Sequence, residues 1–347
     1  MTKILLQITF LIGLSIACYS QKSEMSSAFK NKEFEKVIEL GKQIIESDPN
    51  DFDGLLGIGK SYNILNEFNS AIPYLEKAKV YAEKNWQLSW SNIELMESYF
   101  AIGNIERSKE YYERALEFDG TKNSKKKLKS LALLFGFDNE YKNWETLETK
   151  NISFHFQKGT SINDKENYIN GRENAFSNIN AFFSSVLPKK IDFFVWESND
   201  EAIRVLNKSL GFTKPKYCIS HNRDNQTKGH EIAHNISFWL DKTHNRNRLI
   251  NEGIGVYFDQ TKSNRLQKAK IVVENQKINI KELWVNGDNY SEKIFYPVAG
   301  AFVENLILID KKKFLELCKN QSYKNAELIY GIELEKIIYD FNKKLNK

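Results

Sequence analysis

The segment most suggestive of chemistry holds two histidines four residues apart, with a glutamate directly after the first: His230-Glu231-Ile232-Ala233-His234. On a helix, residues four apart lie one turn apart on the same face. His230 and His234 can therefore offer two imidazole nitrogens to one metal ion. Glu231 lies at the edge of that face, where its carboxylate can take a proton from a metal-bound water. The spacing predicts a helical metal site with its own general base.

A catalytic zinc site needs a third protein ligand and an open position for water. Glu252 lies 18 residues after His234, in the segment Asn251-Glu252-Gly253, and a polar loop over residues 241–247 separates the two. A second helix that begins near Asn251 would fold back and present the Glu252 carboxylate to the metal. We therefore expect Glu252 to complete the ligand set.

Together, the H-E-x-x-H motif and the downstream N-E-G-x-x-x-Y-F segment resemble the gluzincin metallopeptidases, in particular the peptidase-MA-like domains of bacteria. Residues 296–303 (YPVAGAFV) are similar to the Y-x-x-x-G-[AS]-F element of that family, and the resemblance covers residues 147–347. It implies a thermolysin-like α+β fold, one Zn²⁺ per chain and hydrolysis of peptide bonds in a peptide or protein substrate. It also implies that His230, His234 and Glu252 bind zinc and that Glu231 is the general base.

The tetrahedral oxyanion of such a reaction needs a second electrophile beside the metal, often a tyrosine or histidine. Tyr296 is our first candidate because it opens the Y-P-V-A-G-A-F stretch, and Tyr257 and His221 are alternatives. The sequence has Val256 where thermolysin-like enzymes carry an acidic residue beyond the ligands, so Asp259 is the candidate for orienting the first histidine. The G-x-M-E-N motif of the clan's aminopeptidases is absent, which favours an endopeptidase.

Length and composition indicate an ordinary globular protein of two domains. The 347 residues are 41% hydrophobic and 27% charged, which is too apolar for a disordered chain. The net charge of +5 is small against 50 basic and 45 acidic residues, so we expect no nucleic-acid partner. Cys218 and Cys318 are 100 residues apart and carry no metal or redox spacing; they either pair in an exported protein or pack as small buried hydrophobes.

The N-terminus has the pattern of an export signal. Lys3 precedes an apolar run over residues 4–17, which is too short to span a bilayer comfortably, so residues 1–20 are a candidate signal peptide and 21–27 a polar linker. Cleavage after Ser20 is one possibility. Alternatively, residues 15–18 (SIAC) resemble a lipobox, which would place a lipid on Cys18 as the only membrane attachment. Both predict a periplasmic, envelope-anchored or secreted protein.

Residues 28–138 show a helical pattern that repeats. Residues 34–38 and 68–72 lie 34 positions apart, the period of tetratricopeptide repeats, and a third copy follows after three extra residues. This segment resembles two to three such repeats and predicts an all-α domain. A basic run over residues 122–129 leads into a capping helix with a solvated face. The repeats either bind a protein partner or substrate, or act as a spacer.

Residues 145–347 are predicted to form the α+β, gluzincin-like domain. Strands are expected at 152–156, 191–196 and 217–220, with helices at 168–186 and 201–210 between them. Further helices are expected at 301–309, 311–317, 326–330 and 332–345. The resemblance implies that the strand ahead of the zinc helix is a sheet edge, to which an extended peptide could add.

The expected function is that of an exported zinc-dependent metallopeptidase. Two alternatives stay open on the residues alone. One is a peptidase-like binding or scaffold protein with little turnover, although the complete motif argues against decay. The other is a zinc amidohydrolase that acts on a non-protein substrate of the cell envelope.

Overall fold

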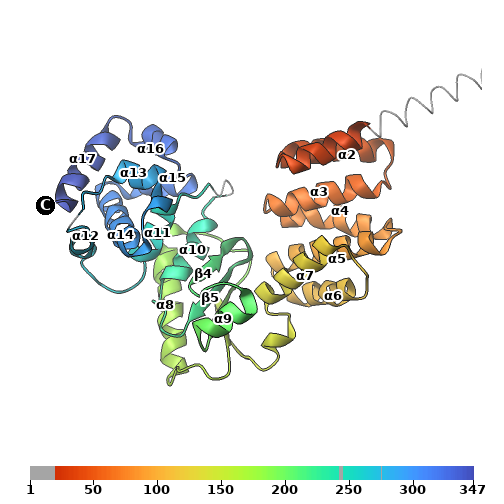
Figure 1. Ribbon diagram of the computed structural model, residues 1–347, viewed down its shortest axis with the longest axis horizontal. Coiled ribbons are helices and arrows are strands. Elements are labelled where there is room, and N and C mark those ends of the chain that lie inside the picture. Colours follow the sequence, from red (N-terminus) through yellow and green to blue (C-terminus); the bar gives the residue numbers. More distant parts are fainter. Residues whose placement is uncertain (1–19, 242–244, 275) are drawn as a thin grey trace, which may run out of the picture. The chain divides into compact units, whose positions relative to one another are not determined.

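The computed structural model describes residues 20–241, 245–274 and 276–347, and it divides into two compact units between Lys142 and Asn143 (Figure 1). The first unit is helical, and the second is a mixed α/β unit with a five-stranded sheet, so the expected order of fold classes is confirmed. The signal peptide and the lipid site at Cys18 lie outside the described residues, apart from Ser20. Residues 21–27, expected as a polar linker, lie within a helix over residues 20–30.

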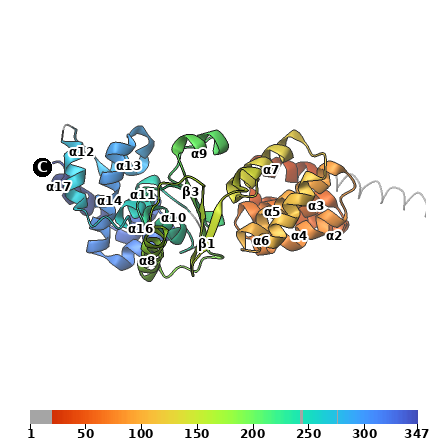
Figure 2. The ribbon, with the colours of Figure 1, turned by 90° about the horizontal axis from the view of Figure 1, so that it is seen from below.

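The first unit consists of helices packed against their neighbours in sequence (Figure 2). After the helix at 20–30 come α2 (Phe34–Ser47), α3 (Phe52–Ile64), α4 (Phe68–Val80), α5 (Asn85–Ala101), α6 (Ile105–Leu116) and α7 (Lys122–Phe135). Fully buried Ala71 and Ala78 let α4 approach its neighbours closely. A Cβ on Gly59 would lie 2.4 Å from Leu75 Cδ2, so only glycine allows this approach of α3 to α4.

A network of charged and amide side chains crosses the first unit from α3 to α7. Lys127 Nζ lies 2.7 Å from both a Glu94 and a Glu97 carboxylate oxygen on α5. Asn63 donates to the other Glu94 oxygen at 3.1 Å and accepts from the Ser98 hydroxyl at 2.6 Å. Helix α7 therefore begins with the expected basic run. The solvated face predicted for that run does not include Lys127, because its ammonium group binds the two buried carboxylates.

The second unit is built on a sheet with strand order β1-β2-β3-β5-β4. Its strands are β1 (Glu145–Glu148), β2 (Ile152–Phe156), β3 (Ile191–Trp196), β4 (Phe212–Lys214) and β5 (Ile219–Arg223). Strands β2, β3 and β5 are parallel, and the short strands β1 and β4 pair antiparallel at the two edges. The expectation that the strand ahead of the zinc helix forms the edge is wrong. Strand β4, which the sequence did not predict, covers β5 and takes that place.

One face of the sheet packs on helices α8 (Lys165–Phe183) and α10 (His230–Phe238) (Figure 1). Because side chains alternate along a strand, Phe154 and Phe193 point into this core while His155 and Phe194 point to the opposite face. The His155 imidazole stacks on Phe194 there and lies 2.8 Å from an Asp192 carboxylate oxygen, in agreement with the packing role expected for it.

In the second unit, α11 (Arg248–Tyr257) and α14 (Glu292–Ile309) pack on each other, α12 (Arg265–Val273) and α15 (Lys311–Lys319) pack on α14, and α13 (Ile280–Val285) packs on α11. The other elements of this unit are α9 (Asn199–Leu206), α16 (Tyr323–Tyr330), α17 (Glu333–Leu345) and the 3₁₀ turns η2 (Pro215–Tyr217) and η3 (Gly287–Asn289). The 3₁₀ turn η1 (Asn139–Tyr141) belongs to the first unit. Helix α14 begins nine residues before the expected helix at 301, so it includes Tyr296. Gly300 lets it pack on α11, since a Cβ there would lie 2.3 Å from Val256 Cγ1.

Two further expectations concern the cysteines and the membrane. Cys218 and Cys318 are both buried and free, so they behave as small hydrophobes and the alternative of a disulfide is wrong. Within the described ranges, the helices are too short or too polar to cross a bilayer.

Candidate metal centre

Three potential metal ligands converge between helices α10 and α11. His230 is the first residue of α10, His234 lies one turn later, and Glu252 lies on α11. The Nε2 atoms of the two histidines are 3.1 Å apart, and each is 3.5 Å from Glu252 Oε2. The structure thus brings together the three residues that the sequence singled out as ligands.

These distances fit one tetrahedral zinc ion. With metal–ligand bonds of about 2.0–2.2 Å and tetrahedral angles, two ligand atoms lie about 3.3–3.6 Å apart. All three groups offer lone pairs toward the same point. Burial favours the neutral form of Glu252, but the two histidines hold the pKa of its carboxyl well below its usual range. Burial likewise lowers the pKa of His234, yet Glu252 raises it above its ordinary value. The negative charge of Glu252 therefore favours a cation here.

Two glycines let the ligand helices come this close. A Cβ on Gly255 would lie 2.6 Å from Cε1 of His230, so α11 passes directly beside the imidazole. A Cβ on Gly229, just before α10, would lie 1.8 Å from the main-chain oxygen of Phe258 at the end of α11. Any side chain at either position would move a ligand, because real Cβ atoms do not approach other atoms so closely.

Glu231 is buried beside the ligands, with 3% of its surface exposed. The Thr213 hydroxyl donates to its Oε2 at 2.6 Å, and the Gln226 side-chain amide donates to its Oε1 at 3.2 Å. Both oxygens of the carboxylate are therefore held, one from edge strand β4 and one from the loop between β5 and α10. Sequence reasoning missed Thr213 and Gln226: the place of Thr213 beside Glu231 depends on the pairing of β4 with β5, and that of Gln226 depends on the conformation of the loop before α10.

The ligands and Glu231 open onto a cleft of about 1010 Å³. Its wall includes the segment that leads into and forms β4, from Lys208 to Thr213, together with Tyr296 and Glu292 of α14. Because β4 is an edge strand, one side of its main chain faces away from the sheet. The cleft has the size of a binding site for an extended segment or a small molecule.

Tyr296 is the one of the three predicted oxyanion donors that lines the cleft. Its ring centroid lies 6.1 Å from that of His230, and burial together with Glu252 raises its pKa to about 12, so it stays a protonated donor at neutral pH. His221 is instead fully buried in the sheet, where Trp196 Nε1 donates to its Nδ1 at 3.0 Å. Tyr257 lies under the Arg265 guanidinium, 5.0 Å from its ring centroid, outside the cleft wall.

The carboxylate of Asp259 does not orient the first histidine. It accepts from the main-chain N–H and from the hydroxyl of Thr261, both at 2.8 Å, and it lies 3.6 Å from an Arg265 guanidinium nitrogen. Asp259 lines the cleft. In this part of the chain, Gly255 is the residue that packs against the His230 ring.

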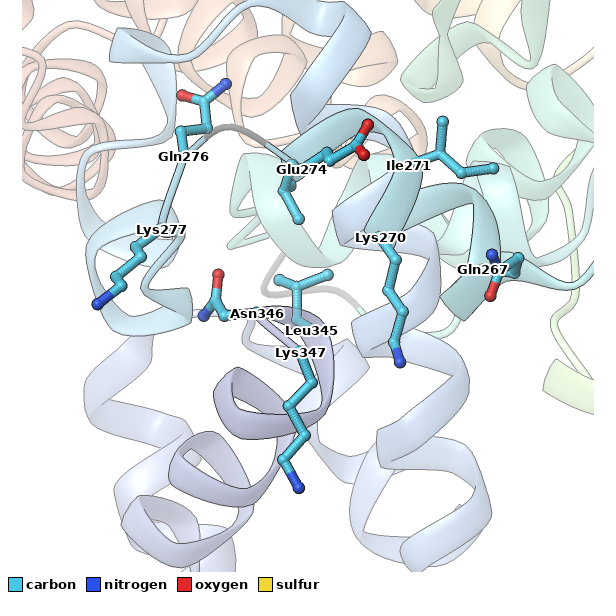
Figure 3. Close-up of a pocket in the computed structure, with 10 residues that line it drawn as sticks. Gln267, Lys270, Ile271, Glu274, Gln276, Lys277, Leu345, Asn346 and Lys347 are labelled. Atoms are coloured by element: carbon cyan, nitrogen blue, oxygen red, sulfur yellow. The ribbon is translucent and has the colours of Figure 1, made fainter.

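A second cavity of about 690 Å³ lies between α12 and the end of α17 (Figure 3). Lys270, Lys277 and Lys347 line it together with Glu274 and several amides. It shares no residue with the cleft, and its side chains include no pair of adjacent potential metal ligands.

Comparison with known proteins bears on the first unit. A family model, the tetratricopeptide repeat, matches residues 97–122. The match spans the end of α5, all of α6 and the start of α7, within the expected third repeat. The first unit thus contains a tetratricopeptide repeat, which favours a protein partner. Among curated proteins, none matches the chain.

Proposed function

We propose that the second unit is a gluzincin-like zinc metallopeptidase that hydrolyses peptide bonds. The observation that carries the proposal is the convergence of His230, His234 and Glu252, at separations that suit tetrahedral zinc, beside a buried glutamate in a large cleft. Zinc bound there would supply a water of lowered pKa and polarise the substrate carbonyl.

The residues around the ligands are suited to the remaining steps. Glu231 accepts the proton of the attacking water and later passes it to the leaving amine, as a general base and then a general acid. Tyr296 donates a hydrogen bond to the oxyanion, since its raised pKa keeps the phenol protonated. Neither residue is one of the three proposed ligands, so substitution of either should leave the ligand set in place.

The substrate class follows from the cleft wall. An extended peptide can pair with the free side of β4, since Phe212 and Thr213 line the cleft and the strand has a partner on one side only. This arrangement favours protein or peptide substrates over compact small molecules. The tetratricopeptide repeat unit would bind a protein partner or the substrate itself, and the N-terminal segment would direct export, with Cys18 as the candidate lipid attachment.

The deciding experiment measures zinc by elemental analysis and cleavage of casein and a peptide library, for the wild type and a Glu231→Gln variant. We expect one zinc per chain in both proteins and cleavage by the wild type alone. Zinc without cleavage of protein, peptide or envelope amides would favour a binding protein. Cleavage confined to envelope amides would favour an amidohydrolase. A chain that takes up no zinc even after reconstitution would overturn the proposal.

A further inference from the structure

We infer that Thr213 and Gln226 are positioning residues that fix the orientation of the Glu231 carboxylate. The inference rests on the proposed function for its catalytic consequence, but its geometric content concerns these side chains alone. The two residues come from separate segments, β4 and the loop after β5, and each donates to a different oxygen of the same carboxylate.

Burial makes these two hydrogen bonds necessary. With 3% of Glu231 exposed, solvent replaces few of the hydrogen bonds that its charged carboxylate loses, and an unpaired buried charge is costly. A glutamate side chain has three rotatable bonds, so its carboxylate needs at least two directional contacts to keep one orientation. Thr213 and Gln226 supply both, and they leave the remaining lone pairs of the carboxylate for a proton in the cleft.

Both donors are themselves held. Thr213 pairs with Ser220 in the β4–β5 ladder, which sets the position of its hydroxyl. The Gln226 main-chain oxygen accepts a 2.8 Å hydrogen bond from the Arg172 guanidinium of α8. Arg172 is 3% exposed, and within the described ranges its guanidinium donates to main-chain oxygens and has no acidic partner. Its buried charge thus anchors the loop that carries Gln226.

A fixed carboxylate matters for proton transfer more than for substrate binding. General base catalysis needs the acceptor oxygen within hydrogen-bond reach of the water, whereas peptide pairing with β4 uses main-chain groups. Loss of the Thr213 hydroxyl should therefore lower kcat and leave KM close to the wild-type value. A purely structural role would instead change zinc content, KM and stability together.

The experiment compares Thr213→Val, which removes the hydroxyl at nearly constant volume, with Thr213→Ser, which keeps it. Thr146→Val is the matched control: Thr146 lies on the opposite edge strand, β1, and its hydroxyl bonds His155 at 3.0 Å. We expect kcat to fall about 10-fold in Thr213→Val at unchanged KM and zinc content, from the loss of one hydrogen bond to a charged group. Thr213→Ser and Thr146→Val should stay within about twofold of the wild type.

Crystal structures of the wild type and of Thr213→Val and Gln226→Leu give a readout that does not depend on activity. Rotation of the Glu231 carboxylate in either variant, with the ligands unmoved, supports the inference. An unchanged carboxylate, or an unchanged kcat in an active Thr213→Val enzyme, overturns it. If the wild type binds zinc but cleaves nothing, the proposed function fails, while the orientation of the carboxylate still decides the inference.

Discussion

Each unit of the molecule buries a cluster of ionisable side chains, and the two clusters differ in how their charge is balanced. In the repeat unit, Lys127 places one ammonium 2.7 Å from both Glu94 and Glu97, so opposite charges meet. In the α/β unit, Glu252 faces two imidazoles whose nitrogens are 3.1 Å apart, and all three groups can offer a lone pair to one cation.

The difference separates a structural network from a candidate site. Burial and perturbed pKa values occur in both clusters: Glu94 and Glu97 raise the pKa of Lys127 against the effect of burial, and Glu252 does the same for His234. Only the second cluster combines converging lone pairs with an opening to a large cleft. Convergence of potential ligands, more than buried charge itself, is therefore the feature on which the proposed metal site rests.

Removal of an acceptor from the second cluster should have the largest effect. Glu252→Ala leaves two nitrogens and removes the negative charge, so we expect zinc to be lost on dialysis and cleavage to fall below detection. Glu292→Ala, which removes another carboxylate of the same cleft, should keep the metal. Elemental analysis and cleavage assays on both variants test this. Full zinc occupancy in Glu252→Ala would contradict the ligand assignment.

The next effect concerns the donor beside the ligands. Tyr296→Phe should keep zinc and lower kcat about 100-fold, since one oxyanion donor is lost. Tyr257→Phe is the matched control, because Tyr257 lies under Arg265 and outside the cleft wall. Steady-state kinetics on the two variants tests this. Loss of activity in Tyr257→Phe but not in Tyr296→Phe would contradict the assignment of Tyr296 as the oxyanion donor.

A smaller change should follow from crowding the first histidine. Gly255→Ala places a methyl group where the His230 ring lies, so the ring must turn and zinc affinity should fall about 10–100-fold. Gly57→Ala, in helix α3 of the repeat unit, meets the flexible Met25 side chain and should leave zinc affinity unchanged. Competition with a chromogenic chelator measures the zinc affinity of both variants. An unchanged affinity in Gly255→Ala would mean that zinc binding does not depend on the position of the His230 ring.

The smallest effect is expected in the repeat cluster and should spare the metal. Lys127→Met removes the ammonium that lies 2.7 Å from both Glu94 and Glu97, and it should destabilise the first unit by about 1–2 kcal/mol, less than for a fully buried pair because Lys127 is partly exposed. Lys129→Met, on the exposed side of α7, serves as control. Hydrogen exchange of α5 and α7 amides reports the change. Loss of zinc from Lys127→Met would contradict the conclusion that the Lys127 cluster is structural and separate from the metal site.

The strongly patterned elements could be read from the sequence. The strands at 152–156 and 191–196 have the expected bounds, because runs of Phe, Ile and Val between turn residues leave little choice. The order of an all-helical region followed by a mixed α/β region is confirmed as well. Local spacing also placed His230 and His234 one turn apart on a helix, since both lie within a single element.

What the sequence did not reveal depends on contacts between distant segments. Strand β4 has three residues beside a proline, too short for a periodic signal, and it is a strand only because β5 pairs with it. Thr213 therefore could not be linked to Glu231 in advance. Similarly, no local pattern distinguishes Lys127 from the other lysines of its run, because its partners lie on α5.

The glycines around the ligands have a consequence for recognising relatives of this chain. At Gly229, Gly253, Gly255 and Gly300, a Cβ would lie 2.6 Å or less from an atom of a neighbouring element. A descriptor that requires glycine at these four positions, at their spacing from the H-E-x-x-H residues, would encode the three-dimensional approach of α10, α11 and α14. Such a descriptor would separate distant homologues that share this packing from chains in which the short motif arose by chance.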